Sequence, residues 1–210
     1  MLLALYNSVR MEMNSGTILG YFLQALPIAS IVGVVFLIIR LVLRRRENRR
    51  IKWGQEILRV IFVCYLTGLI SLVVLPANFW LHVYDGIFFG WWEEMGPVFQ
   101  LGGVNLVPTL LQCLTGELSL GSWMRTMLIG NVAMFVPFGL LLPLVTGIKG
   151  GKRLVLAAVF VPACFEVAQL IFGRSLDVDD LICNFIGLMI GLGIAWAILR
   201  ARPANRSKSA

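Results

Sequence analysis

Residues 166–191 read EVAQLIFGRSLDVDDLICNFIGLMIG, and apolar sequence continues on both sides of them. Ionisable groups therefore lie in or beside the hydrocarbon of a membrane. A charged group at the centre of a membrane-spanning helix costs about 3 kcal/mol on insertion scales, so such groups usually have a partner or a function. We expect this stretch to form a hairpin of two spans that carries the functional site.

The composition of the whole chain is that of an integral membrane protein. Hydrophobic residues make up 59%, charged residues make up 14%, and the mean hydropathy is +0.86, far from the values of soluble domains. Five apolar runs are long enough to cross about 30 Å of hydrocarbon as helix. They cover residues 18–43, 57–75, 127–146, 154–172 and 181–199. The predicted fold is an all-α, polytopic membrane helix bundle of about five transmembrane helices with an outer interfacial segment.

The basic residues predict how the spans are oriented, because Lys and Arg are enriched in cytoplasmic loops. They concentrate in residues 40–59, in residues 149–153 and in the tail, which leaves only Arg10, Arg125 and Arg174 on the opposite side. This pattern predicts a multi-pass plasma-membrane protein with its N-terminus outside and its C-terminus in the cytoplasm. The net charge of +7 then indicates topology and contact with anionic lipid, and no nucleic-acid partner is expected.

The segment 77–126 is rich in aromatic residues, which suit the headgroup layer of a membrane. We expect one or two short interfacial helices there, interrupted around Gly96-Pro97 and Gly102-Gly103. A re-entrant hairpin near residues 105–108 is the alternative.

No metal site or cofactor is predicted. A divalent ion on Asp177, Asp179 and Asp180 is only a weak alternative, because the short Asp-x-Asp-Asp motif is also explained as helix capping. The cysteines lack CxxC or metal-ligand spacing and are expected to pack as apolar residues. They are Cys64, Cys113, Cys164 and Cys183. His82, the one histidine, is expected at the membrane surface with no ligand or base role.

Candidate site residues stand on both sides of the predicted turn at residues 173–177. Glu166 and Gln169 are three residues apart and therefore share a helix face. Across the turn, Asp177 can cap the next helix, with Asp179 and Asp180 in its first turn, where the helix dipole favours carboxylates. These aspartates are expected either to cap the helix or to take part in a functional site. Arg174 is expected to pair with Glu166 or Asp180.

The fifth and third spans carry further candidate residues for this site. Asn184, Gly187 and Gly191 form a small-residue stripe, which predicts a close helix contact. In the third span, Asn131 lies one turn in, where it serves either as an interhelical hydrogen bond or as part of a site. We expect one polar pocket that opens to the outer leaflet and is lined by Asn131, Glu166, Gln169, Arg174, Asp180 and Asn184.

Ordered motif blocks run through the second half of the chain. They are Asn105-Leu-Val-Pro108; Asn131 with Phe135-Val-Pro-Phe-Gly139 and Pro143; Glu166-x-x-Gln169; and Arg174-x-x-Asp177-x-Asp179-Asp180-x-x-x-Asn184-x-x-Gly187. These blocks resemble those of the VanZ-like membrane proteins, a family named for a teicoplanin-resistance accessory protein. The resemblance covers about residues 58–199, and Thr109 stands where family patterns usually have Phe or a similar residue.

The resemblance adds Asn105 to the expected site. We expect three parts in the chain. They are an N-terminal anchor helix with a basic loop (1–52), a VanZ-like domain (53–200) and a basic tail expected to be disordered (201–210).

Three functions are compatible with these residues. The first, which the family name favours, is a pocket that binds an amphiphile, either a lipid-linked envelope precursor or a lipoglycopeptide, and thereby confers teicoplanin tolerance. The second is an intramembrane enzyme in which Glu166 or Asp180 is the general acid or base and Arg174 holds a phosphate or carboxylate. The third is a transporter or scaffold, suggested by helices broken at Pro137, Pro143 and Pro162. The motifs by themselves imply no particular reaction.

Overall fold

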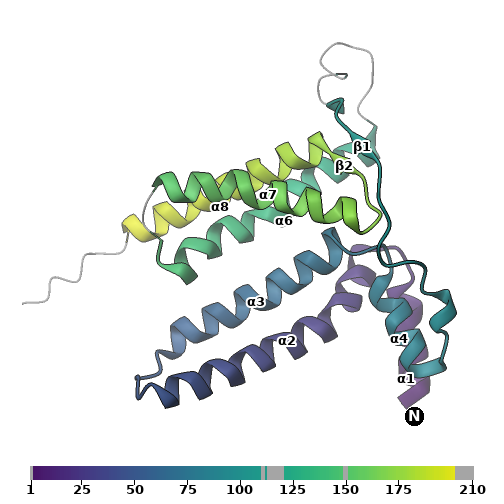
Figure 1. Cartoon of the computed structure of the whole chain (residues 1–210), viewed down its shortest axis with the longest axis horizontal. Coiled ribbons are helices and arrows are strands. Elements are labelled where there is room, and N and C mark those ends of the chain that lie inside the picture. Colours follow the sequence, from purple (N-terminus) through teal and green to yellow (C-terminus); the bar gives the residue numbers. More distant parts are fainter. Residues whose placement is uncertain (1, 110–111, 113–120, 149–150, 202–210) are drawn as a thin grey trace, which may run out of the picture. The chain divides into compact units, whose positions relative to one another are not determined.

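The computed structural model describes residues 2–109, 112, 121–148 and 151–201, and most of them are helical (Figure 1). Five helices are long and apolar enough to cross a membrane, which confirms the predicted spans and the all-α class. They are α2 (Ile18–Arg46), α3 (Trp53–Val73), α6 (Ser122–Thr146), α7 (Gly151–Ile171) and α8 (Val178–Ala201). The expectation of a disordered tail concerns residues that, apart from Ala201, lie outside the described part of the chain.

The chain divides into two compact units. The first comprises Met1–Pro108 and Ala163–Val178, and the second comprises Thr109–Pro162 and Asp179–Ala210. The chain passes between the units after Pro108, after Pro162 inside α7, and where α8 begins. The candidate site residues are therefore distributed over both units.

In the first unit, α2 and α3 pack against each other as an antiparallel hairpin (Figure 1). Thr17 caps α2, because its hydroxyl accepts a hydrogen bond of 3.1 Å from the amide of Gly20. The last turn of α2 carries Arg44, Arg45 and Arg46, where positive charge is favoured by the helix dipole. The short basic loop between the helices thus lies at one end of two adjacent spans.

A helix that the sequence did not predict, α1 (Leu2–Met13), packs against α4 (Phe79–Phe89) and α2. Asp85 on α4 is buried and accepts hydrogen bonds from the Tyr6 hydroxyl at 2.8 Å and from Arg10 Nε at 2.7 Å. The ring of Tyr6 also stacks on Phe88, with centroids 4.3 Å apart. Helix α4 and the short η1 (Trp92–Glu94) fall within the aromatic segment in which interfacial helices were predicted.

After η1 the chain becomes extended and runs along the C-terminal end of α7. Strand β1 (Val104–Asn105) pairs in parallel with β2 (Leu176–Asp177), and Gln100 bridges to Phe172. Gly102 permits this approach, since a Cβ atom there would lie 1.8 Å from the carbonyl oxygen of Arg174. Residues 104–105 are therefore in a strand that pairs with β2, and the re-entrant hairpin considered near residues 105–108 stays a prediction.

In the second unit, α6 and α8 are in backbone contact through glycines. A Cβ atom at Gly187 would lie 2.1 Å from the carbonyl oxygen of Val132, and one at Gly191 would lie 2.1 Å from that of Val136. The close helix contact predicted from the small-residue stripe is confirmed, with α6 as its partner.

The prolines do not break the spans. Helix α6 continues through Pro137 and Pro143, and α7 continues through Pro162. The expectation of broken helices, on which the transporter hypothesis rested, was therefore wrong for these spans. A proline inside a long apolar helix removes one hydrogen bond but leaves the neighbouring turns intact, and in a span those turns have no water to bond instead.

Candidate functional site

The two most buried polar side chains of α7 lie near its C-terminal end. Glu166 is 2% exposed and Gln169 is 3% exposed. They are three residues apart and share a helix face, as the sequence predicted. The carboxylate of Glu166 accepts a hydrogen bond from the main-chain amide of Asp177, with N to Oε2 at 3.2 Å. Glu166 is thus tied to the segment that follows the turn after α7.

The pairing of β1 with β2 places Asn105 directly beside Asp177. Asn105 Nδ2 donates to Asp177 Oδ2 at 2.9 Å, while Asn105 Oδ1 accepts from the amide of Val107 at 3.2 Å. Both ends of the Asn105 amide are used, so its orientation is determined by the network. The Asn105 predicted from family resemblance therefore belongs with Glu166 and Asp177.

Gln169 and Arg174 bond to the C-terminal end of α3. Gln169 Nε2 donates to the carbonyl oxygen of Val73 at 3.1 Å, and Arg174 Nη1 donates to that of Leu72 at 3.0 Å. The last carbonyls of a helix lack partners within it, and a cation is favoured there. The expected pairing of Arg174 with Glu166 or Asp180 stays a prediction.

In the second unit, the aspartates at the start of α8 have partners on the preceding segments. Asn131 Nδ2 on α6 donates to Asp180 Oδ1. Asp179 is buried and accepts a hydrogen bond of 2.7 Å from the amide of Thr109. Because the main chain of Thr109 makes this bond, the contact does not require the aromatic residue usual in the family. Asn184 is buried one turn further along α8.

The structure therefore groups the predicted residues into two clusters. The Glu166 cluster lies in the first unit and consists of Asn105, Glu166, Gln169, Arg174 and Asp177. The Asp180 cluster lies in the second unit and consists of Asn131, Asp179, Asp180 and Asn184. Convergence of the two clusters on one pocket that opens to the outer leaflet stays a prediction.

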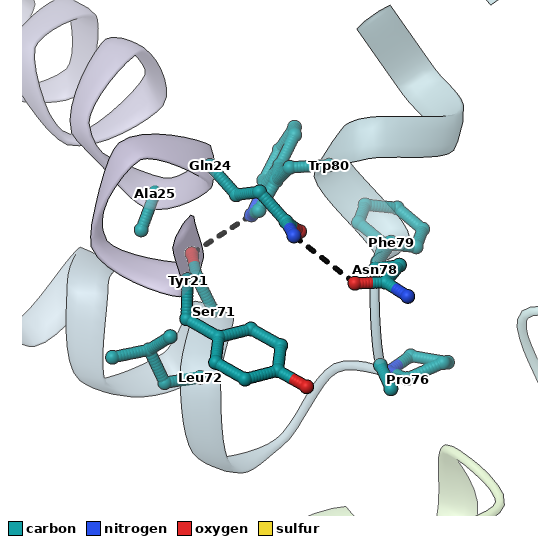
Figure 2. Close-up of a pocket in the computed structure, with 10 residues that line it drawn as sticks. Tyr21, Gln24, Ala25, Ser71, Leu72, Pro76, Asn78, Phe79 and Trp80 are labelled. Atoms are coloured by element: carbon teal, nitrogen blue, oxygen red, sulfur yellow. Dashed lines mark hydrogen bonds between the residues drawn. The ribbon is translucent and has the colours of Figure 1, made fainter. Parts of the chain in front are cut away.

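A small cavity in the first unit lies between the start of α2, the end of α3 and the start of α4 (Figure 2). Gln24 points toward Asn78, to which its Nε2 donates at 3.0 Å, and Trp80 Nε1 donates to Ser71 at 2.9 Å. Its volume of about 20 Å³ has room for one water molecule. It is too small to hold the headgroup of an amphiphile.

Sequence reasoning missed two buried acids outside the predicted site. They are Asp85, paired with Arg10, and Glu56, which is surrounded by arginines near the basic loop. Burial favours the neutral form of Asp85, but the hydrogen bonds from Arg10 and Tyr6 outweigh it and hold the pKa of this carboxyl below its ordinary value. The sequence could have indicated Glu56, because an acidic residue within a strongly basic stretch is expected to pair with its neighbours.

The family model described as VanZ/LLP1 matches residues 62–200, which contain all nine residues of the two clusters. Neither the curated proteins nor the solved structures gave a significant match. Because the matched region covers well over half of the 210 residues, the chain belongs to the VanZ/LLP1 family of membrane proteins.

Proposed function

We propose that this protein binds the polar headgroup of a cell-envelope amphiphile at the Glu166 cluster. The observation that carries the proposal is Gln169 Oε1, a buried acceptor that makes no hydrogen bond with any described residue. Buried polar atoms nearly always have a hydrogen-bond partner, so this acceptor is available to a ligand that donates a hydrogen bond. Glu166, one turn before it, adds a buried carboxylate on the same face.

The chemistry of these groups limits the ligand. A carboxylate and an amide oxygen both accept hydrogen bonds, so the ligand must donate them, through hydroxyl, ammonium or amide N–H groups. Lipid-linked envelope precursors and lipoglycopeptides carry such groups on their sugars and peptides, and their acyl chains remain in the bilayer. The basic loops support an orientation in which the cluster faces the outer leaflet, where both kinds of amphiphile are present.

Co-purification of lipids tests the proposal. The wild-type protein, Glu166→Leu, Gln169→Leu and the control Ser175→Ala would each be purified and analysed by native mass spectrometry, because leucine removes the accepting oxygen at either position. Ser175 is an exposed residue in the same turn. We expect wild type and Ser175→Ala to retain the same amphiphile and both site variants to lose it. Identical lipid profiles in all four proteins would contradict the proposal.

The link to drug tolerance is tested separately. A strain that expresses the wild-type protein should tolerate more teicoplanin than the same strain with Glu166→Leu, provided that both proteins reach the membrane in equal amounts. If the lipid profile changes between these variants and the tolerance does not, the ligand is an envelope lipid and not the drug.

Intramembrane catalysis is the second candidate, and the burial of Glu166 favours it. A buried carboxyl group held in place by a hydrogen bond can serve as a general acid or base. Loss of an enzyme would change the amounts of its substrate and its product in the cell. Lipid analysis of a deletion strain should then reveal an accumulated precursor and a missing product, and an unchanged lipidome would exclude this role.

A further inference from the structure

The loop end of the α2–α3 hairpin holds a cluster of three arginines around one buried acid. Glu56, in the first turn of α3, is 0% exposed. Arg40 donates two hydrogen bonds to its carboxylate, from Nε to Oε2 at 3.0 Å and from Nη2 to Oε1 at 2.9 Å. Arg59 Nη1 donates to Oε1 at 2.7 Å, and Arg44 Nε lies 3.4 Å from the same oxygen. We call these four residues the arginine cluster.

The arginine cluster is not electrically neutral. One carboxylate faces three guanidinium groups, which leaves two positive charges in excess. The nearest other acid in the sequence, Glu47, is exposed and pairs with Arg49 at 3.2 Å, and it acts on Arg40 through a weaker charge interaction than Glu56 does. Partly buried charge of one sign is costly at the end of a span unless an anion compensates it.

One guanidinium group of the arginine cluster is held less tightly than the others. Arg44 Nε faces Glu56 Oε1 at 3.4 Å as an ion pair and makes no hydrogen bond with any described residue. The arginine side chains are between 20% and 26% exposed, so an outside group can reach them. Glu56 holds the guanidinium planes in place from within, as a buried counterion does in a preorganised anion site. Guanidinium groups recognise phosphate through paired N–H donors.

The surroundings of the arginine cluster indicate a lipid as the source of that phosphate. Leu43, Trp53 and Ile57 lie at the same end of the hairpin and are large, apolar and exposed. A tryptophan at the end of a span is typical of the headgroup layer, and its neighbours would contact acyl chains there. A free phosphate ion would gain nothing from these three side chains.

We propose that the arginine cluster binds the phosphate of an anionic phospholipid, with Arg44 and Arg59 as its principal donors. All four residues precede the region that matches the family model, so the site belongs to the part of the chain outside that match. It is independent of the Glu166 cluster and of any amphiphile bound there.

Reconstitution in nanodiscs tests this site. Native mass spectrometry would measure the lipids retained by the protein from mixtures of phosphatidylglycerol and phosphatidylcholine. The double variant Arg44→Gln/Arg59→Gln removes the proposed donors. Arg45→Gln/Arg50→Gln removes the same charge from neighbouring positions for which the structure describes no contact with Glu56. We expect the first variant to retain about tenfold less phosphatidylglycerol than the wild-type protein. The second variant should retain nearly as much as the wild-type protein, because its arginines lie outside the cluster and attract the lipid only as separate surface charges.

Three results would overturn the proposal. Equal losses in the two double variants would mean that diffuse charge attracts the lipid. Equal retention of both lipids by the wild-type protein would mean that the arginine cluster is structural only, and this comparison stands even if a variant does not fold. Displacement of the lipid by millimolar inorganic phosphate would assign the site to free phosphate.

Discussion

The main-chain amide of Asp177 donates a hydrogen bond to the buried carboxylate of Glu166, at 3.2 Å, across the turn that joins α7 to α8. The bond uses a main-chain donor, so it constrains the path of the turn and not the identity of residue 177. Asp177 can then use its own carboxylate to hold Asn105. Through Asp177, Glu166 is thus linked to Asn105 in β1, which is distant in the sequence.

Loss of the Glu166 acceptor should destabilise this turn. Glu166→Ala leaves the amide of Asp177 without its partner, which costs about 1–3 kcal/mol, whereas Glu166→Gln keeps an oxygen that accepts the bond. Thermal unfolding in detergent should therefore rank the two variants in that order. Equal losses of stability would mean that the negative charge of Glu166, and not its role as acceptor, stabilises the turn.

Asn105 should stabilise the pairing of β1 with β2. Asn105→Ala removes its bonds to Asp177 and Val107, and we expect a loss of about 1 kcal/mol for the bond to the carboxylate. Amide hydrogen exchange should also rise in residues 104–105. Leu106→Ala, at the next and exposed position, is the control and should leave the exchange of these strands unchanged.

Thr109 should matter through its main chain alone. Thr109→Ala keeps the amide that donates to Asp179 and should leave the unfolding temperature unchanged. Thr109→Pro removes that amide and leaves a buried carboxylate oxygen without this donor, which costs about 2 kcal/mol. If both variants behaved alike, the contact between Thr109 and Asp179 would not contribute to stability.

The glycine contact between α6 and α8 should tolerate no methyl group. Gly187→Ala would place its Cβ atom 2.1 Å from the carbonyl oxygen of Val132, so the helices must separate. We expect a loss of about 1–3 kcal/mol, as for other overpacked positions. Gly193→Ala on the same helix meets no atom within 4 Å and should be neutral or slightly stabilising. Unfolding of both variants in detergent would measure the difference.

The pair of Arg10 and Asp85 should make the packing of α1 on α4 sensitive to acid. The pKa of Asp85 is lower in the folded protein than its ordinary value of about 3.9. The stability that it contributes is therefore fully present above about pH 4 and is lost as the pH falls through the folded pKa. Asp85→Asn should lose this contribution at neutral pH and show a flatter stability profile in acid. An unchanged acid profile in Asp85→Asn would assign the acid sensitivity to other groups.

Features of the fold that depend on local composition were predictable. The spans follow from apolar length, and the close contact of α8 follows from glycines at a spacing of four, since these are properties of one helix. Helix α1 was not predicted, because it docks through a few long-range contacts such as Tyr6 with Asp85 and has no strong pattern of its own. The burial of Glu56 was not predicted either, because its arginine partners come from two helices.

The amino-acid sequence was enough to predict five spans and the polar residues that interrupt them, because insertion into hydrocarbon depends on composition along the chain. The partners of those polar residues became known from the folded chain alone. Asn105 lies beside Asp177, Asn131 lies beside Asp180, and Gln169 and Arg174 bond to the end of α3. A buried polar group bonds to whichever partner the packing brings within hydrogen-bond distance, and spacing along one helix does not encode that distance.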